Sequence, residues 1–119
     1  MTIRDPRPDI MAMLLDEAAA AAAAGEVPVA AAVTDAEGAI IALAQNRMRR
    51  DGSALHHAEM LVLADALALR GSERLEDCDL WVTLEPCTMC AGAIAHARIR
   101  RLSVSYTHLT LPTKLAVLI

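Results

Sequence analysis

His57-Ala58-Glu59 and, 27 positions past the glutamate, Pro86-Cys87-Thr88-Met89-Cys90 are the two segments around which this sequence is arranged. Together they supply one imidazole, two thiols and one carboxylate. Zinc binds such nitrogen and sulfur donors tetrahedrally, and three protein ligands leave a fourth position for water. A metal lowers the pKa of its water, and a nearby carboxylate can transfer the protons. The segments predict a catalytic zinc site, one ion per chain, with ligands His57, Cys87 and Cys90 and with Glu59 carrying protons.

The spacing within each segment suits a shared site at the starts of two helices. His57 and Glu59 would lie about 200° apart on a regular helix, so only a helix start lets both line one pocket. Cys87 and Cys90 are i and i+3, neighbours on one helical face. Pro86 suits the first helical position, and the dipole of that helix would favour both thiolates.

The pair Cys87 and Cys90 has two other interpretations, a redox pair and half of a structural zinc site. A redox pair would not need His57 or Glu59. A structural site would need a fourth ligand, and the remaining candidates stand at no recognisable ligand spacing: Cys78, His56 and His96. The compound pattern H-x-E…P-C-x-x-C is instead the signature of zinc-dependent nucleobase deaminases, so we favour the catalytic site.

Composition predicts one domain of 119 residues with a modest core. Apolar residues make up 55%, inflated by alanine, and aromatic residues are nearly absent. We find no signal peptide and no apolar run of the roughly 20 residues that a membrane helix needs. Three cysteines without framework spacing indicate the reducing cytoplasm. The net charge of −4 argues against indiscriminate nucleic-acid binding but permits a local basic patch.

The remaining pattern predicts an α/β protein with element order α-β-β-α-β-α-β, a mixed sheet with helices on its faces. After an irregular lead-in over residues 1–8, we expect helices at 9–24, 57–69 and 86–97 and strands at 27–33, 40–44, 80–84 and from 102. Asp9 is expected to cap the first helix and Gly25 to end it. The strand 40–44 is expected to be interior, the helix 57–69 buried nearly all round, and residues 45–53 a polar loop.

Four stretches carry a resemblance to a known family: Gly25-Glu26-Val27-Pro28-Val29, Asn46-Arg47, His57-Ala58-Glu59 and Val82 to Ile94. Over roughly residues 10–102 the chain resembles the bacterial tRNA-specific adenosine deaminases of the cytidine/deoxycytidylate deaminase superfamily. The resemblance implies a cytidine-deaminase-like three-layer α/β/α sandwich, a homodimer and conversion of adenosine to inosine at the wobble position of a tRNA anticodon. The anticodon loop is already single-stranded, which lowers the cost of extruding a base.

Carried over by position, the resemblance makes His57, Cys87 and Cys90 the zinc ligands, Glu59 the proton shuttle and Asn46 a contact to the flipped base. Two arginine clusters suit a polyanionic substrate, although such charges are also common on a solvated surface. The candidate tRNA contacts are Arg47, Arg49 and Arg50, and the second cluster is Arg98, Arg100 and Arg101. Two alternatives stay open: a deaminase of free guanine, cytosine or cytidine with the same fold, and a non-catalytic zinc-stabilised fragment.

The chain departs from the family in three places. Ser53-Ala54-Leu55-His56 stands where the family usually has Asp-Pro-Thr-Ala, and Ala30 replaces a usual glycine. The stretch from Val104 to Thr113 resembles the translation of a transposon adapter used in short-read library preparation. We therefore expect residues 1–102 to form a zinc-dependent deaminase domain that lacks its last strands and C-terminal helix. Residues 103–119 are then a non-native tail, and His108 is no ligand candidate.

Overall fold

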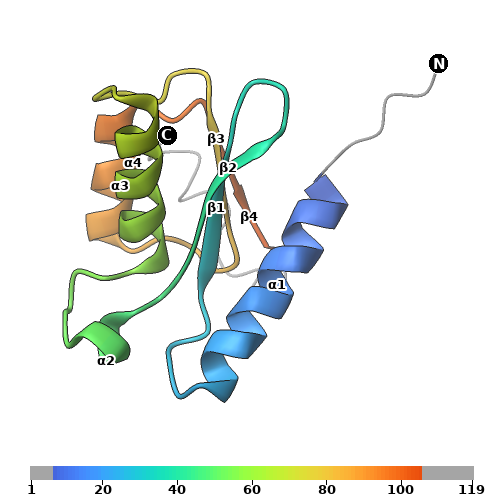
Figure 1. Ribbon diagram of the computed structural model, residues 1–119, viewed down its shortest axis with the longest axis vertical. Coiled ribbons are helices and arrows are strands. Elements are labelled where there is room, and N and C mark those ends of the chain that lie inside the picture. The colour runs from blue at the N-terminus through green and yellow to red at the C-terminus, as the bar shows by residue number, and fades with distance from the viewer. Residues whose placement is uncertain (1–6, 106–119) are drawn as a thin grey trace.

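The computed structural model describes residues 7–105 and places them in a four-stranded sheet with helices on both faces (Figure 1). The elements in chain order are α1 (Arg7–Ala23), β1 (Ala30–Thr34), β2 (Ile40–Gln45), α2 (Met48–Asp51), α3 (Ala58–Arg70), β3 (Asp79–Val82), α4 (Thr88–Ala97) and β4 (Arg101–Val104). The predicted α/β class and element order are confirmed. One element was not predicted, the short helix α2, which lies in the expected polar loop.

The strand order brings three distant segments to one end of the sheet. The order is β2-β1-β3-β4, with β1 antiparallel to both neighbours and β3 parallel to β4. A parallel pair needs a long crossover, which α4 supplies. Ala30 pairs with Gln45, and Ala31 pairs with Val82. The start of β1, the end of β2 and the end of β3 therefore lie together.

Two apolar layers hold the helices on the sheet. Leu80 and Val82, both fully buried, pack toward α3 and α4, whereas Trp81 between them packs toward α1. This alternation follows from the two-residue period of a strand. The Trp81 Nε1–H donates a buried hydrogen bond of 2.9 Å to Thr34 Oγ1. Helices therefore cover both faces, and the expected three-layer sandwich is confirmed (Figure 1).

The expectation that 40–44 is an interior strand is wrong. The interior strands are β1, all five residues of which are buried, and β3, while β2 lies at the edge. Ile40 and Leu43 on β2 stay 42% and 40% exposed. The small alanines of β1 let neighbouring elements approach both of its faces, so β1 is covered completely. The apolar residues of β2 do not require an interior position.

Two helix predictions also need correction. Helix α1 begins at Arg7 rather than after a cap at Asp9, because Pro8 lies in its first turn, where a missing N–H breaks no helical bond. Gly25 ends it as expected: its φ is +84°, and the next N–H, of Glu26, bonds back to Ala21 O. Helix α3 is buried on one face only, with Leu69 65% exposed.

Strand β4 crosses the boundary that we expected after Leu102. Ser103 pairs with Trp81 and Val104 with Val82, so the sheet continues through Val104. From Tyr106 onward the adapter-like stretch, including His108, lies outside the described residues. The non-native origin of the tail stays a prediction. Among residues 7–105, no helix is both long enough and apolar enough to cross a membrane.

Core packing should depend strongly on Leu80 and weakly on Leu69. Leu80 is 0% exposed in the layer under α3 and α4. We expect Leu80→Ala to lower the free energy of unfolding by about 2–5 kcal/mol, because it leaves a cavity. The same substitution at exposed Leu69 should cost less than about 0.5 kcal/mol. Chemical denaturation of both variants measures the difference, and equal losses would contradict the burial assigned to Leu80.

Candidate metal centre

The three predicted ligands are carried by the starts of two adjacent helices. His57 is the N-cap of α3, Cys87 is the N-cap of α4, and Cys90 lies in the first turn of α4. Both caps have extended backbone, with ψ of 149° and 175°. Helices α3 and α4 lie side by side on one face of the sheet (Figure 1). Because Cys87 takes the N-cap position, α4 begins at Thr88, and Pro86 precedes the helix instead of opening it.

The donor atoms of these side chains have the separations of a tetrahedral zinc site. His57 Nδ1 lies 3.4 Å from Cys90 Sγ and 3.6 Å from Cys87 Sγ. Zinc bonds of about 2.0–2.1 Å to nitrogen and 2.3 Å to sulfur, at tetrahedral angles, place the two donors about 3.6 Å apart. Within residues 7–105, this is the one cluster of His, Cys, Asp or Glu close enough to hold a metal ion. The predicted ligand set is brought together.

The candidates for a fourth ligand lie elsewhere. Cys78 is buried in the core, with Sγ 3.4 Å from Asp77 Oδ1, and burial with the adjacent Asp77 raises its pKa to about 11. His56 Nδ1 is 2.8 Å from Asp51 Oδ2. His96 belongs to the last turn of α4, away from the ligands in its first turn. The cluster therefore has three protein ligands, as in zinc sites that keep a position open for chemistry.

Glu59 lies beside the ligands in the first turn of α3 and is 4% exposed. Burial raises its pKa, and its own backbone N–H, the charge of His57 and the Cys90 thiol only partly offset this. A carboxylate with a raised pKa accepts a proton more readily than an exposed one, which suits a proton shuttle. The structure places Glu59 where the sequence predicted it, next to the metal ligands.

The helix dipole alone would lower the pKa of the Cys90 thiol, but the structure gives the opposite direction. Burial and the neighbouring charge of Glu59 raise the pKa of Cys90, so its thiol holds its proton more tightly than a free cysteine does. Metal ligation requires the thiolate, and a divalent cation lowers the pKa of a coordinating thiol. Zinc binding here should therefore release a proton from Cys90.

Asn46, the residue expected to contact the base, lies at the same end of the sheet as this cluster. It follows β2, is 3% exposed, and its N–H donates to Val29 O at 2.9 Å. Its Oδ1 accepts the N–H of Met48 at 3.0 Å. The next residue, Arg47, donates its N–H to the carbonyl of His56, the neighbour of the ligand His57. With one lone pair of Oδ1 engaged, Asn46 still has its Nδ2 donor for a ligand.

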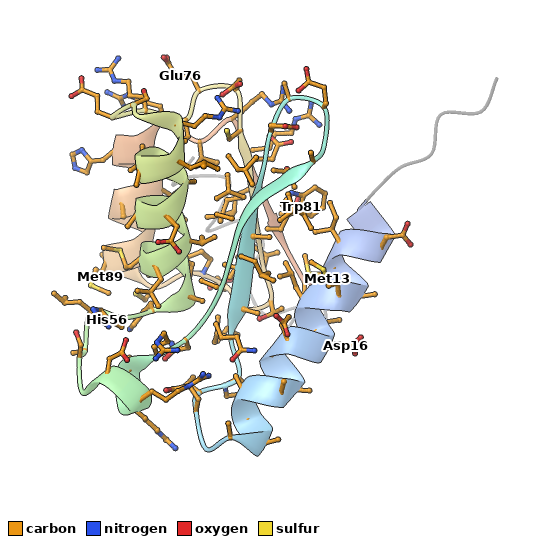
Figure 2. All side chains as sticks on the ribbon, viewed as in Figure 1. Met13, Asp16, His56, Glu76, Trp81 and Met89 are labelled. Atoms are coloured by element: carbon orange, nitrogen blue, oxygen red, sulfur yellow. The ribbon has the colours of Figure 1, made fainter. Side chains whose placement is uncertain are left out.

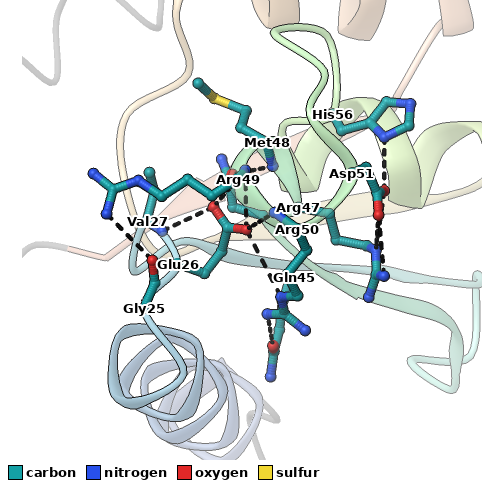
Figure 3. A network of polar contacts seen from close by, with 11 residues as sticks. Gly25, Glu26, Val27, Gln45, Arg47, Met48, Arg49, Arg50, Asp51 and His56 are labelled. Carbon is teal, nitrogen blue, oxygen red and sulfur yellow. Dashed lines mark hydrogen bonds and ion pairs between the residues drawn. The ribbon is translucent and has the colours of Figure 1, made fainter.

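The three arginines that follow, Arg47, Arg49 and Arg50, differ in the contacts that their guanidinium groups make within the chain (Figure 3). Arg47 makes a two-pronged ion pair with Asp51, at 3.1–3.2 Å. Arg50 donates to Gln45 Oε1 at 2.7 Å and lies 3.7 Å from Glu26. Among the described contacts, the Arg49 guanidinium has one, to Gly25 O at 3.2 Å. Arg49 thus has the most donors left for a ligand.

The second arginine cluster lies at the opposite end of the sheet. Arg100 pairs with Asp79 at 2.9 and 3.0 Å, and Asp79 begins β3, whereas the metal ligands follow the end of that strand. Arg98 ends α4, whose other end carries Cys87 and Cys90. These arginines are not brought to the candidate metal centre.

Sequence reasoning missed the role of Glu26, a buried carboxylate near the start of β1. Burial would raise its pKa, but backbone N–H groups of Arg50, Val27 and Arg49, with the charge of Arg50, hold the pKa below its ordinary value. The only hint in the sequence was a charged residue between Gly25 and the apolar start of a strand. Its partners are 23 and 24 positions away, so the sequence pattern did not reveal them.

Comparison with known proteins agrees with this geometry. Residues 6–106 match the family described as the cytidine and deoxycytidylate deaminase zinc-binding region. A curated relative from Agrobacterium fabrum, a tRNA-specific adenosine deaminase, is 47% identical over 96 residues, which are 81% of this chain and 62% of the relative. The chain spans about three fifths of the length of such curated relatives.

Two solved structures share the fold. One comes from a study of A-to-I editing by tRNA:A34 deaminases at the wobble position of transfer RNA. It has a TM-score of 0.79 and 45% identity, over 84% of this chain and 76% of that one. The other, guanine deaminase from Bacillus subtilis, has a TM-score of 0.76 and 32% identity, over 80% of this chain and 60% of that one.

The ligand assignment predicts different zinc contents for variants in which one of two buried cysteines is replaced. We expect Cys90→Ala to reduce zinc from about one ion per chain to almost none and to lower stability, because metal binding is coupled to folding. Cys78→Ala is the matched control, since Cys78 is also buried but is not near the cluster. It should keep its zinc. Metal analysis of the purified variants measures this, and zinc retained by Cys90→Ala would overturn the assignment.

Proposed function

Because this chain belongs to the cytidine and deoxycytidylate deaminase family, we propose that it deaminates adenosine to inosine at the wobble position of a tRNA anticodon. The observation that carries the proposal is the cluster itself. His57 Nδ1 lies 3.4 and 3.6 Å from two cysteine sulfurs, and a buried carboxylate lies beside them. Such a donor set with an adjacent non-ligand glutamate suits hydrolytic deamination of a nucleobase.

Each residue has a distinct task in this reaction. The chemistry that zinc supplies when held by His57, Cys87 and Cys90 is activation of water at neutral pH. Glu59 accepts a proton from the attacking water and delivers it to the departing amine, so water adds at C6 and ammonia leaves. Its burial keeps bulk water from competing for that proton. Asn46 holds the base through its Nδ2 donor.

The tRNA substrate is supported by the relatives and by the charge distribution. The Agrobacterium fabrum relative is named a tRNA-specific adenosine deaminase. The anticodon loop presents unstacked bases, so little free energy is needed to move one into a pocket. Arg49, which follows Asn46 closely in the chain, is exposed and supplies positive charge, although the whole chain is acidic. The resemblance to these deaminases also supports a homodimer that acts in the cytoplasm.

One alternative substrate has support of its own. The guanine deaminase of Bacillus subtilis shares the fold at a TM-score of 0.76. Its 32% identity is lower than the 45% shared with the tRNA:A34 deaminase structure. A free base would need no arginine contact, so the two substrates are distinguished by whether a polyanionic chain is required.

Deamination assays on an anticodon stem-loop and on free guanine, cytosine and cytidine test the proposal. We expect inosine in the stem-loop and little product from the free compounds. Glu59→Gln should keep its zinc and lose about 10²–10⁴-fold in rate, because the proton shuttle is removed. Deamination of guanine alone would overturn the tRNA proposal, and loss of zinc in Glu59→Gln would place Glu59 among the metal ligands.

Arg49 is expected to contact a phosphate of the tRNA. We expect Arg49→Ala to weaken stem-loop binding and to reduce the slope of log affinity against log salt by about 0.7, because one counterion fewer is released from single-stranded RNA. The matched control is Arg98→Ala, since Arg98 also contacts one backbone carbonyl but lies at the far end of α4. Binding titrations at several salt concentrations measure both. An unchanged slope in Arg49→Ala would assign this charge to the solvated surface.

A further inference from the structure

Glu26 is a buried acid that binds backbone from another part of the chain. Its side chain is 0% exposed. The carboxylate accepts the N–H groups of Val27 at 3.0 Å, Arg49 at 3.2 Å and Arg50 at 3.0 Å (Figure 3). Through these hydrogen bonds Glu26 links the connection between α1 and β1 to the helix α2, which follows β2.

These bonds complete the cap of α2. Helix α2 has four residues, too few to be stable by itself, and its first N–H groups have no partners within the helix. Asn46 Oδ1 accepts the N–H of Met48, and Glu26 accepts those of Arg49 and Arg50. The side chain of Arg47, the N-cap residue, makes no cap hydrogen bond. The turn is therefore held by Asn46 and Glu26.

The same turn connects the base contact to the metal ligand. Asn46 stands directly before it, and the Arg47 N–H bonds to the carbonyl of His56 at 2.9 Å. Asp51, at the end of α2, accepts from the Arg47 guanidinium and pairs with His56 Nδ1 at 2.8 Å. Movement of α2 would displace Asn46 and disturb the approach of the chain to His57.

We propose that Glu26 is a positioning residue: by capping α2 it fixes the place and orientation of Asn46 at the end of the sheet that carries the metal ligands. This inference rests on the proposed function for the role of Asn46, but the capping itself does not. A carboxylate suits the task because both oxygens only accept, whereas a glutamine amide would direct donors at other donors. An unpaired buried donor is costly, so the turn should shift when the carboxylate is lost.

Glu26→Gln in the zinc-loaded full chain tests the inference, with Glu76→Gln as the matched control. Glu76 is exposed and lies at the opposite end of the molecule from His56 (Figure 2). In Glu26→Gln we expect hydrogen exchange at the Arg49 and Arg50 amides to accelerate about tenfold to hundredfold, because their charged acceptor is removed. Zinc content should stay near one ion per chain, and kcat/KM on the anticodon stem-loop should fall about tenfold to hundredfold. Glu76→Gln should match the wild type in all three.

The three measurements separate positioning from other roles. Unchanged exchange at Arg49 and Arg50 would overturn the capping, and faster exchange with unchanged kcat/KM would overturn the positioning role. Loss of zinc together with activity would show that Glu26 supports the metal site as a whole. If no variant or wild type acts on the stem-loop, the proposed function fails while the exchange result still decides the capping. Glu26→Asp, which keeps the charge but shortens its reach, replaces Glu26→Gln if that variant does not fold, and should show smaller losses in the same order.

Discussion

The candidate centre depends on two helix starts, those of α3 and α4, being held side by side at one end of the sheet. Strand β3 and strand β4 are parallel, so the chain between them must cross over one face, and α4 makes that crossing. The crossing begins at the end of β3 and so places Cys87 and Cys90 there. Helix α3 packs on the same face against α4, which brings His57 within 3.6 Å of both sulfurs.

Burial, as much as pairing with other groups, sets the pKa values of the acidic side chains near this centre. Glu59 and Cys90 are both buried, and burial raises the pKa of each. Glu26 is buried as well, but three backbone N–H groups and Arg50 keep its pKa low. Glu59 is therefore suited to accepting a proton, whereas Glu26 is suited to remaining an anion that holds backbone in place. Hydrogen bonding to the charged form accounts for the difference.

The arginines show how a sequence pattern can be divided by structure. Arg47, Arg49 and Arg50 are equivalent as a basic cluster in sequence. In the folded chain, Arg47 and Arg50 are engaged with Asp51, Gln45 and Glu26, whereas Arg49 retains most of its donors. Side chains that already have partners contribute less to binding a phosphate, since those contacts would have to be broken. Asp51 and Gln45 are local partners, but Glu26 comes from a segment 24 positions before Arg50, and the sequence pattern did not reveal that contact.

The sequence by itself determined the chemistry: the zinc ligands, the neighbouring glutamate, the order of the main elements and the turn at Gly25 follow from local spacing and from backbone preferences. Those features involve residues a few positions apart, or side chains whose combination of nitrogen and sulfur donors is typical of a zinc site. Tertiary structure alone decided that β1 rather than β2 is interior, that α2 exists, and that Glu26 caps it. Each of these depends on packing or hydrogen bonds between segments more than 20 positions apart. The physical reason is that the neighbours of a strand and the donors to a buried carboxylate are set only when distant segments come together in the folded chain.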